Sequence, residues 1–374
     1  MARTVRRVLV IGAGVSGLTT ALTLAGNGLD VHVLGERPAE RTVSAVAGAL
    51  WEFPPAVCGQ HGNPVSISRS KSWCMASYQK FAGLRTLKAS TGPAYSGVRM
   101  VRANFYFTEP VESDRVEVVK RRELEALYEV GQIQGYRRLT GEDVDERVVK
   151  EFGIVDGYRL TVPAVDAPVY MGWLRRQAVH SGVTVQEGGR RVTGRLLPQE
   201  AALRKEFEVD AIVNCSGMGA AELAGAAMVP LRGALIRMPA DKLNRPVIQA
   251  HALAKSRDEQ DMLLVVPRGD TVMLGGLVEP GEYDSGLDKG YPPVREMYRR
   301  CQDFLHEELE GVGLDDEDVE LVVGLRPYRV ENVCLEREYG FNIVHNFGHA
   351  GSGFSFSWGC AREVLDLVMG MERV

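Results

Sequence analysis

The sequence lacks the features of several large classes of protein. Its six cysteines are widely separated and form no C-x-x-C pair, so neither a disulfide framework nor a zinc site is expected, and no metal is predicted. No stretch approaches the ~18 uninterrupted apolar residues that a membrane-spanning helix needs. The 44 basic residues are outnumbered by 49 acidic ones, so the chain has no excess positive charge with which to attract nucleic acid or an anionic membrane.

What is present is the composition of an ordinary globular protein. The 374 residues are 45% hydrophobic and 25% charged, which excludes a disordered, collagen-like or coiled-coil chain. That length predicts two or three domains that are stable without disulfides. Arginines precede the first apolar run, but glycines interrupt it and no cleavage site follows, so no signal peptide is predicted. We therefore expect a soluble cytoplasmic protein with reduced thiols, and the sequence leaves its oligomeric state, including a homodimer, open.

The start of the chain has the pattern of a β-α-β unit. Residues 8–11 form a continuous apolar run, which is typical of a strand buried on both faces. Residues 18–24 place apolar side chains at helical spacing, and residues 31–34 predict a second strand that ends near Glu36.

The rest of the chain predicts two kinds of structure. Segments that fit an α/β layer are a helix at 166–181, strands at 182–185, 207–214 and 342–346, and a helix at 359–370. Segments that fit an antiparallel domain are strand-like runs at 99–107, 234–238, 262–266 and 272–275 and a helix at 292–309, while the rest of residues 53–158 reads mainly as loops. The sequence thus predicts an α/β fold with a Rossmann-like, cofactor-binding domain made from discontinuous segments (1–52, 159–230 and 322–374) and an antiparallel α+β substrate domain (53–158 and 231–321).

The loop after the first strand has a glycine pattern that binds dinucleotides. Residues Gly12-Ala13-Gly14-Val15-Ser16-Gly17 follow G-x-G-x-x-G between a buried strand and a helix. In this context the first glycine permits the tight turn, the second lets the backbone approach a pyrophosphate, and the third lets helix and strand pack closely. The pyrophosphate would lie at the helix N-terminus, and Glu36 would accept hydrogen bonds from ribose hydroxyls. A tight turn with no ligand is the alternative.

A second glycine-rich segment lies near the other end of the chain. Gly348-His349-Ala350-Gly351-Ser352-Gly353-Phe354-Ser355 stands between a predicted strand and a predicted helix. An NAD enzyme usually keeps its cofactor half as one N-terminal block, whereas two remote glycine segments suggest a long cofactor held from both ends of the chain. The arrangement therefore favours FAD over NAD.

Four motifs, in order along the chain, match one family. They are VLVIGAGVSGL (residues 8–18), AVAGALWEF (45–53), VDAIVNCSGMGAAEL (209–223) and VHNFGHAGSGFSFSWGCA (344–361). By these motifs the chain resembles the D-amino-acid oxidases, within the broader FAD-dependent amine oxidoreductases. The resemblance implies a fold of the D-amino-acid oxidase type and non-covalently bound FAD.

The resemblance also implies which residues hold FAD. Gly12, Gly14 and Gly17 would hold the pyrophosphate, and Glu36 with Arg37 the adenosine end. Residues expected to line the cofactor further along are Ser44, Gly48, Ala49, Leu50 and Val192. Residues expected to lie against the flavin ring and the ribityl chain are Ala350, Gly351, Ser352, Gly353, Phe354 and Ser355.

The chain departs from the family where the substrate binds. The family holds the substrate carboxylate with an arginine directly before the L-E-R-E stretch and with two tyrosines of the preceding sheet; here Cys334, Gln260 and Leu264 stand at those positions. A free amino acid would leave its carboxylate poorly paired, because the bidentate arginine fork is absent. Arg326 and Arg329, in a predicted loop, are the candidates to replace it, although each could instead form a structural ion pair with a neighbouring glutamate.

These observations predict a FAD-dependent oxidoreductase that acts on CH–NH or CH–NH2 groups. An oxidase of this kind takes a hydride from a C–N bond of an amine or modified amino acid, gives an imine and reduces dioxygen to hydrogen peroxide. Its partners would be a small amine-type substrate and dioxygen. Three alternatives stay open: a conventional D-amino-acid oxidase, a flavin-dependent monooxygenase or desaturase, and a non-catalytic flavin-binding protein.

Overall fold

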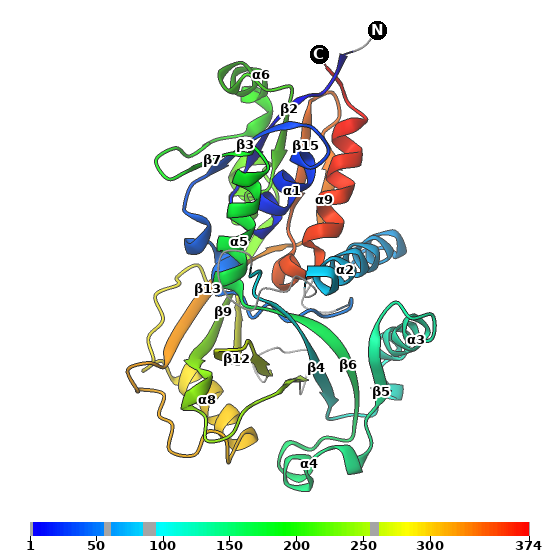
Figure 1. The fold of residues 1–374 in the computed structure, drawn as a ribbon, viewed down its shortest axis with the longest axis vertical. Helices are drawn as coiled ribbons and strands as arrows, with labels where there is room; N and C mark the ends of the chain where they lie inside the picture. Colours follow the sequence, from blue (N-terminus) through cyan, green and yellow to red (C-terminus); the bar gives the residue numbers. More distant parts are fainter. Residues whose placement is uncertain (1–2, 56–60, 85–94, 255–261, 374) are drawn as a thin grey trace. The chain divides into compact units, whose positions relative to one another are not determined.

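The chain divides into two units, each built from segments that are remote in sequence. The computed structural model describes residues 3–55, 61–84, 95–254 and 262–373 (Figure 1). The Rossmann unit comprises Met1–Gly97, Asp166–Leu231 and Leu325–Val374. The sheet unit comprises Val98–Val165 and Arg232–Gly324.

Six strands form the sheet of the Rossmann unit, in the order β14-β15-β8-β2-β3-β7. Their bounds are Arg7–Ile11 for β2, Asp30–Gly35 for β3, Thr184–Glu187 for β7, Ala211–Asn214 for β8, Cys334–Arg337 for β14 and Ile343–Phe347 for β15. Neighbours pair in parallel except β14, which runs antiparallel to β15 at one edge. The apolar residues Val8–Ile11 of β2 are buried, as a strand covered on both faces requires, which confirms this predicted strand.

Helices pack on this sheet and on one another. Their bounds are Val15–Ala25 for α1, Pro64–Leu84 for α2, Ala167–His180 for α5, Leu196–Phe207 for α6, Ala220–Leu223 for α7 and Gly353–Met369 for α9. Helix α1 packs against α5 and α9, and α9 packs against α2 (Figure 1). Two short strands, β1 (Arg3–Thr4) and β16 (Glu372–Arg373), pair the two ends of the described chain. The predicted β-α-β start is confirmed.

Eight strands form the sheet of the sheet unit, in the order β13-β9-β12-β11-β10-β4-β6-β5. Their bounds are Val98–Phe107 for β4, Gln134–Arg138 for β5, Asp156–Val165 for β6, Met228–Pro239 for β9, Gln249–Ala254 for β10, Leu263–Pro267 for β11, Thr271–Pro280 for β12 and Glu320–Arg329 for β13. Strands β4 and β10 run parallel, whereas β4–β6, β5–β6, β10–β11 and β11–β12 are antiparallel. The helices are α3 (Arg115–Glu129), α4 (Glu146–Phe152) and α8 (Pro292–Phe304), and α8 packs on β11 and β12.

The expectation that residues 53–158 are mainly loops was wrong. They contain α2, α3 and α4 as well as β5 and the start of β6. Helix α2 escaped detection because it is rich in serine, which has only a moderate helix propensity. Its buried residues include two serines, Ser70 and Ser77, so the apolar stripe that predicts an amphipathic helix is interrupted.

Three predicted boundaries were also wrong. The strand predicted at 207–214 is shorter, because Phe207 ends α6 and Glu208, with φ of 52°, turns the chain before β8 begins. The helix predicted at 359–370 begins six residues earlier, at Gly353, and the helix predicted at 292–309 ends at Phe304. Glycine and serine at the start of α9 concealed its first turn.

The two units are divided differently from the domains predicted from the sequence. Helix α2 lies in the Rossmann unit, because its buried face packs on α9. The whole of β6 lies in the sheet unit, because it pairs with β4 along its full length. Which unit binds which ligand stays a prediction.

Close packing between α2 and α9 depends on Gly359. A Cβ added there would overlap the backbone of Trp73 in α2. We expect Gly359→Ala to push the helices apart and to lower the free energy of unfolding by about 2–3 kcal/mol, measured as a fall of several degrees in Tm. Gly83→Ala, where an added Cβ meets nothing within 4 Å, is the matched control and should leave Tm unchanged or slightly raised. Equal Tm values for the two variants would contradict this packing.

Candidate functional site

Two glycines close the turn between β2 and α1. Gly12 has φ of 117°, and its N–H donates to Leu34 O at 2.8 Å. A Cβ added at Gly12 would overlap Cys215 O, and a Cβ added at Gly17 would overlap Gly12 O. The packing of the chain itself therefore accounts for glycine at both positions.

Gly14 is different, because packing of the described chain does not account for it. A Cβ added there would contact only Ser44 Oγ, at 3.2 Å. Gly14 is the N-cap of α1, supplies no side-chain cap, and is followed by no acidic residue in the first turn. Ser44 Oγ accepts a hydrogen bond from Val15 N at 3.0 Å. The space over Gly14 and the positive end of α1 together fit an anionic group such as a pyrophosphate.

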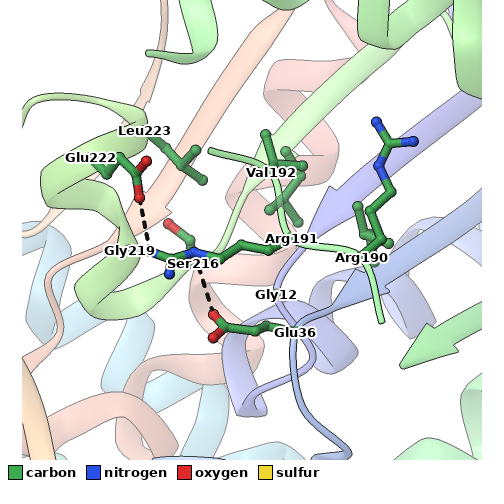
Figure 2. Close-up of a pocket in the computed structure, with 11 residues that line it drawn as sticks. Gly12, Glu36, Arg190, Arg191, Val192, Ser216, Gly219, Glu222 and Leu223 are labelled. Atoms are coloured by element: carbon green, nitrogen blue, oxygen red, sulfur yellow. Dashed lines mark hydrogen bonds and ion pairs between the residues drawn. The ribbon is translucent and has the colours of Figure 1, made fainter. Parts of the chain in front are cut away.

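A cavity of about 110 Å³ lies beside this turn, within the Rossmann unit. Gly12, Glu36 and Val192 line it together (Figure 2). The guanidinium of Arg191 lies between two carboxylates, 2.8 Å from Glu222 and 3.9 Å from Glu36 (Figure 2). The cavity thus combines an apolar wall with a carboxylate that can accept hydrogen bonds from a ribose, as the adenosine end of a dinucleotide needs.

Arg37, predicted at the adenosine end, does not line this cavity, nor do Gly48, Ala49 and Leu50, which were predicted further along the cofactor. Arg37 is exposed, whereas Gly48, Ala49 and Leu50 are half-buried. Ala49 has a left-handed φ of 49°, a backbone conformation that residues other than glycine rarely adopt. Sequence reasoning missed Arg191 and Glu222 because no local pattern links two residues so far apart.

The C-terminal glycine segment lies against the N-terminal one. It runs from β15 through the 3-10 turn Ala350–Ser352 into α9. A Cβ added at Gly353 would lie 3.6 Å from Val15 Cγ1, and Ser16 Oγ is 3.4 Å from His349 Nδ1. The structure therefore brings together the two glycine motifs that the sequence places at opposite ends of the chain.

The side chains of this segment differ in exposure. Ser352, Phe354 and Ser355 are buried, Gly353 is half-buried and Gly351 is exposed. Ser355 Oγ lies 3.4 Å from Glu52 N, in the stretch that follows Leu50. Like α1, α9 begins without a side-chain cap and without an acidic residue in its first turn, so its positive end is also available to an anionic or polar ligand.

Arg326 and Arg329 lie in strand β13, so the loop predicted for them was wrong. Pro327 stands between them, and proline is tolerated here because β13 is an edge strand of its sheet. Arg329 Nη1 donates to Asn332 O at 2.9 Å, and its Nη2 lies 2.7 Å from a carboxylate oxygen of Glu331. Arg326 is half-buried.

The three positions expected from the resemblance to replace the family's substrate anchors are Cys334, Leu264 and Gln260. Cys334 is 3% exposed in β14 and belongs to an apolar cluster with Met228 and Phe347. Burial raises the pKa of the Cys334 thiol above its usual value, so the group is a neutral packed side chain. Leu264 lies in β11, half-buried, opposite Ala252 and Gly275. Gln260 lies outside the described residues.

The part of the chain that the structure describes contains neither a metal cluster nor a membrane-spanning helix. In residues 3–55, 61–84, 95–254 and 262–373, no group of three or more His, Cys, Asp and Glu side chains could hold a metal ion. No helix in the same ranges has both the length and the apolar character needed to cross a membrane.

Comparison with known proteins identifies the family. The model of a family described as "FAD dependent oxidoreductase" matches residues 7–367. The chain belongs to this family. FAD is therefore its cofactor, and the space over Gly14, the cavity at Glu36 and the uncapped start of α9 fit that group.

The similarities extend over nearly the whole chain. A D-amino-acid oxidase of Rubrobacter xylanophilus is 31% identical over 98% of this chain and 96% of the relative. A D-amino-acid oxidase of Streptomyces coelicolor is 30% identical over 96% of each chain. Among solved structures, glycine oxidase from Bacillus cereus superposes with a TM-score of 0.72 at 17% identity, covering 98% of this chain and 96% of that one. The last likeness shows the fold, which confirms the predicted fold class.

The different reasons for Gly14 and Gly17 predict different defects. Gly14→Val should abolish FAD binding, because the side chain would fill the space over the start of α1. Its apoprotein should still fold, with a Tm lowered by less than that of Gly17→Ala, because φ of −74° suits any residue and the Ser44 side chain, 3.2 Å from the added Cβ, can shift. Gly17→Ala should instead reduce the yield of folded protein, since its Cβ overlaps Gly12 O. The flavin absorbance of each purified variant measures FAD binding, and thermal melts of the two apoproteins measure folding. FAD binding by Gly14→Val would contradict the assignment.

Proposed function

We propose that this protein is an oxidase of an amine or modified amino acid whose carboxylate is not held by the arginine fork of the D-amino-acid oxidases. The overall reaction converts an amine, dioxygen and water into a carbonyl compound, a released amine or ammonia, and hydrogen peroxide. When bound, FAD would supply the hydride acceptor and the route of the electrons to dioxygen. The observation that carries the proposal is the burial of Cys334 in an apolar cluster at the place of the missing arginine.

The chain's own residues bind and orient rather than exchange protons. The positive ends of α1 and α9 meet where Gly353 approaches Val15, so both favour negative charge in the same region. Glu36 and Val192 would hold the adenosine end in the cavity of the Rossmann unit. Ser44 would keep the turn in place through its bond to Val15 N. Such positioning supplies most of what a flavoenzyme must add to its cofactor.

A conventional D-amino-acid oxidase is the second candidate. Two relatives, at 31% and 30% identity over nearly the whole chain, carry that name, which favours it. In that case Arg326 or Arg329 of β13 would supply the guanidinium for the substrate carboxylate. Arg326 and Tyr328 share one face of the strand, and Tyr328 pairs with His349 at the start of the C-terminal glycine segment. Residues from Leu325 onward belong to the Rossmann unit, so this pairing lies within that unit and supports a role for Arg326 near the C-terminal glycine segment.

The two candidates differ in the substrates that reduce the flavin. We expect D-alanine, D-proline and D-aspartate to bleach the flavin slowly or not at all, because a carboxylate without a bidentate partner is poorly stabilised in a closed pocket. Their carboxamides, which lack the charge, should react at least as fast. Anaerobic stopped-flow absorbance with the paired acids and amides measures this. Fast, saturable bleaching by the free acids alone would establish the conventional oxidase.

Arg329 tests whether a guanidinium still contacts the substrate. If it does, Arg329→Ala should lower kcat/KM ten- to a hundredfold, about 1.5–3 kcal/mol. Tm should change little, because the partner Glu331 is 71% exposed and such pairs add little stability. Glu331→Gln is the matched control: it removes the ion pair and keeps the guanidinium, so kcat/KM should stay within about twofold. Equal losses of kcat/KM in both variants would show that Arg329 has a structural role.

A further inference from the structure

A serine of the first glycine motif contacts a histidine of the second. Ser16 is the second residue of α1 and is half-buried, whereas His349 is only 4% exposed. Ser16 Oγ and His349 Nδ1 are 3.4 Å apart. The other ring nitrogen, Nε2, is buried and has no hydrogen-bond partner in the part of the chain that the structure describes.

This environment determines where the imidazole carries its proton. Burial lowers the pKa of His349 to about 4, so the ring is neutral and has a single N–H. A proton on Nε2 would leave a buried donor without an acceptor, which is the costlier kind of unpaired polar group. A proton on Nδ1 has Ser16 Oγ as its acceptor. The Nδ1–H form is therefore favoured.

The tautomer in turn determines what the serine hydroxyl can do. Once Ser16 Oγ accepts from Nδ1–H, its own hydrogen must go to another acceptor. We propose that His349 is a positioning residue that holds the Ser16 hydroxyl as a donor to the pyrophosphate of FAD at the start of α1. The inference rests on the placement of FAD at the glycine turn. A hydroxyl that donates to an anionic oxygen makes a short, charge-assisted bond, stronger than a neutral one.

Backbone contacts hold the loop at His349 independently of the imidazole, whose ring also packs edge-on against Phe356. His349 O accepts from Ser352 N at 2.9 Å, and the backbone of His349 pairs with Tyr328. The contact to Ser16 is made by the side chain alone. A role for the ring in ligand binding can therefore be separated from a role in folding.

The test combines a spectroscopic measurement with FAD affinity, both on the full-length protein. In ¹⁵N-labelled wild type, the imidazole spectrum of His349 should show a protonated Nδ1 and a bare Nε2, with and without FAD. Ser16→Ala should weaken FAD binding about tenfold, measured by ultrafiltration. His349→Leu, which has no donor, should weaken it by a similar factor, and adding Ser16→Ala to it should cause little further loss. His349→Asn, whose amide can donate from the Nδ1 position, should bind within about threefold of wild type.

Three results would overturn the proposal. A proton on Nε2 in the wild-type spectrum would mean that Ser16 donates to His349 Nδ1 and does not accept from it. This measurement is made on the wild-type protein and does not depend on the folding of a variant. Ser16→Ala with wild-type FAD affinity would remove the hydroxyl from the site. If the double variant lost FAD affinity by the product of the two single losses, His349 and Ser16 would act separately.

Discussion

The Rossmann unit depends on one close approach of backbone to backbone. At the turn after β2, Gly17 of α1 lies against Gly12 O, and Gly12 lies against Cys215 O at the end of β8. Either contact excludes a Cβ, so the position of α1 on the sheet is fixed by two residues that have none. Because α1 carries the start of the proposed cofactor site, the same contacts would determine where an anionic group binds. Gly14, which the packing does not require, lies at that point.

The second half of the site comes from the other end of the chain because of the order of the strands. Strand β15 pairs in parallel with β8, which pairs in parallel with β2. The carboxyl ends of these strands therefore meet at one edge of the sheet, and the loops that follow β2 and β15 become neighbours. Helix α9 then packs on α1 and α2, which holds its N-terminus beside Val15. This topology supports the proposal that one cofactor is held from two remote segments.

Sequence reasoning predicted the structure best at positions where a single physical requirement determines the residue type. The buried strand at residues 8–11 and the glycines of the turn are such cases, and they predicted a dinucleotide-binding turn. The second glycine segment and the four family motifs were needed to predict FAD and the fold. Prediction failed where packing decided the structure. The serine-rich α2 is a helix because its small buried residues fit against α9, and Pro327 lies in a strand because β13 is at an edge. The contacts of Arg191 with Glu222 and of Ser16 with His349 join distant residues, for which periodicity gives no signal.

We infer that both glycine motifs hold one FAD, whereas Cys334, where the resemblance expects the family's arginine, is buried by packing. A crystal structure of the FAD-bound enzyme tests it most directly. The account predicts pyrophosphate oxygens within hydrogen-bonding distance of the backbone N–H groups at the start of α1 and of Ser16 Oγ, about 2.5–3.2 Å. It also predicts that Cys334 stays buried between Met228 and Phe347, away from the ligand. A pyrophosphate bound away from Gly14, or a Cys334 side chain turned out to contact the flavin or the substrate, would contradict the account.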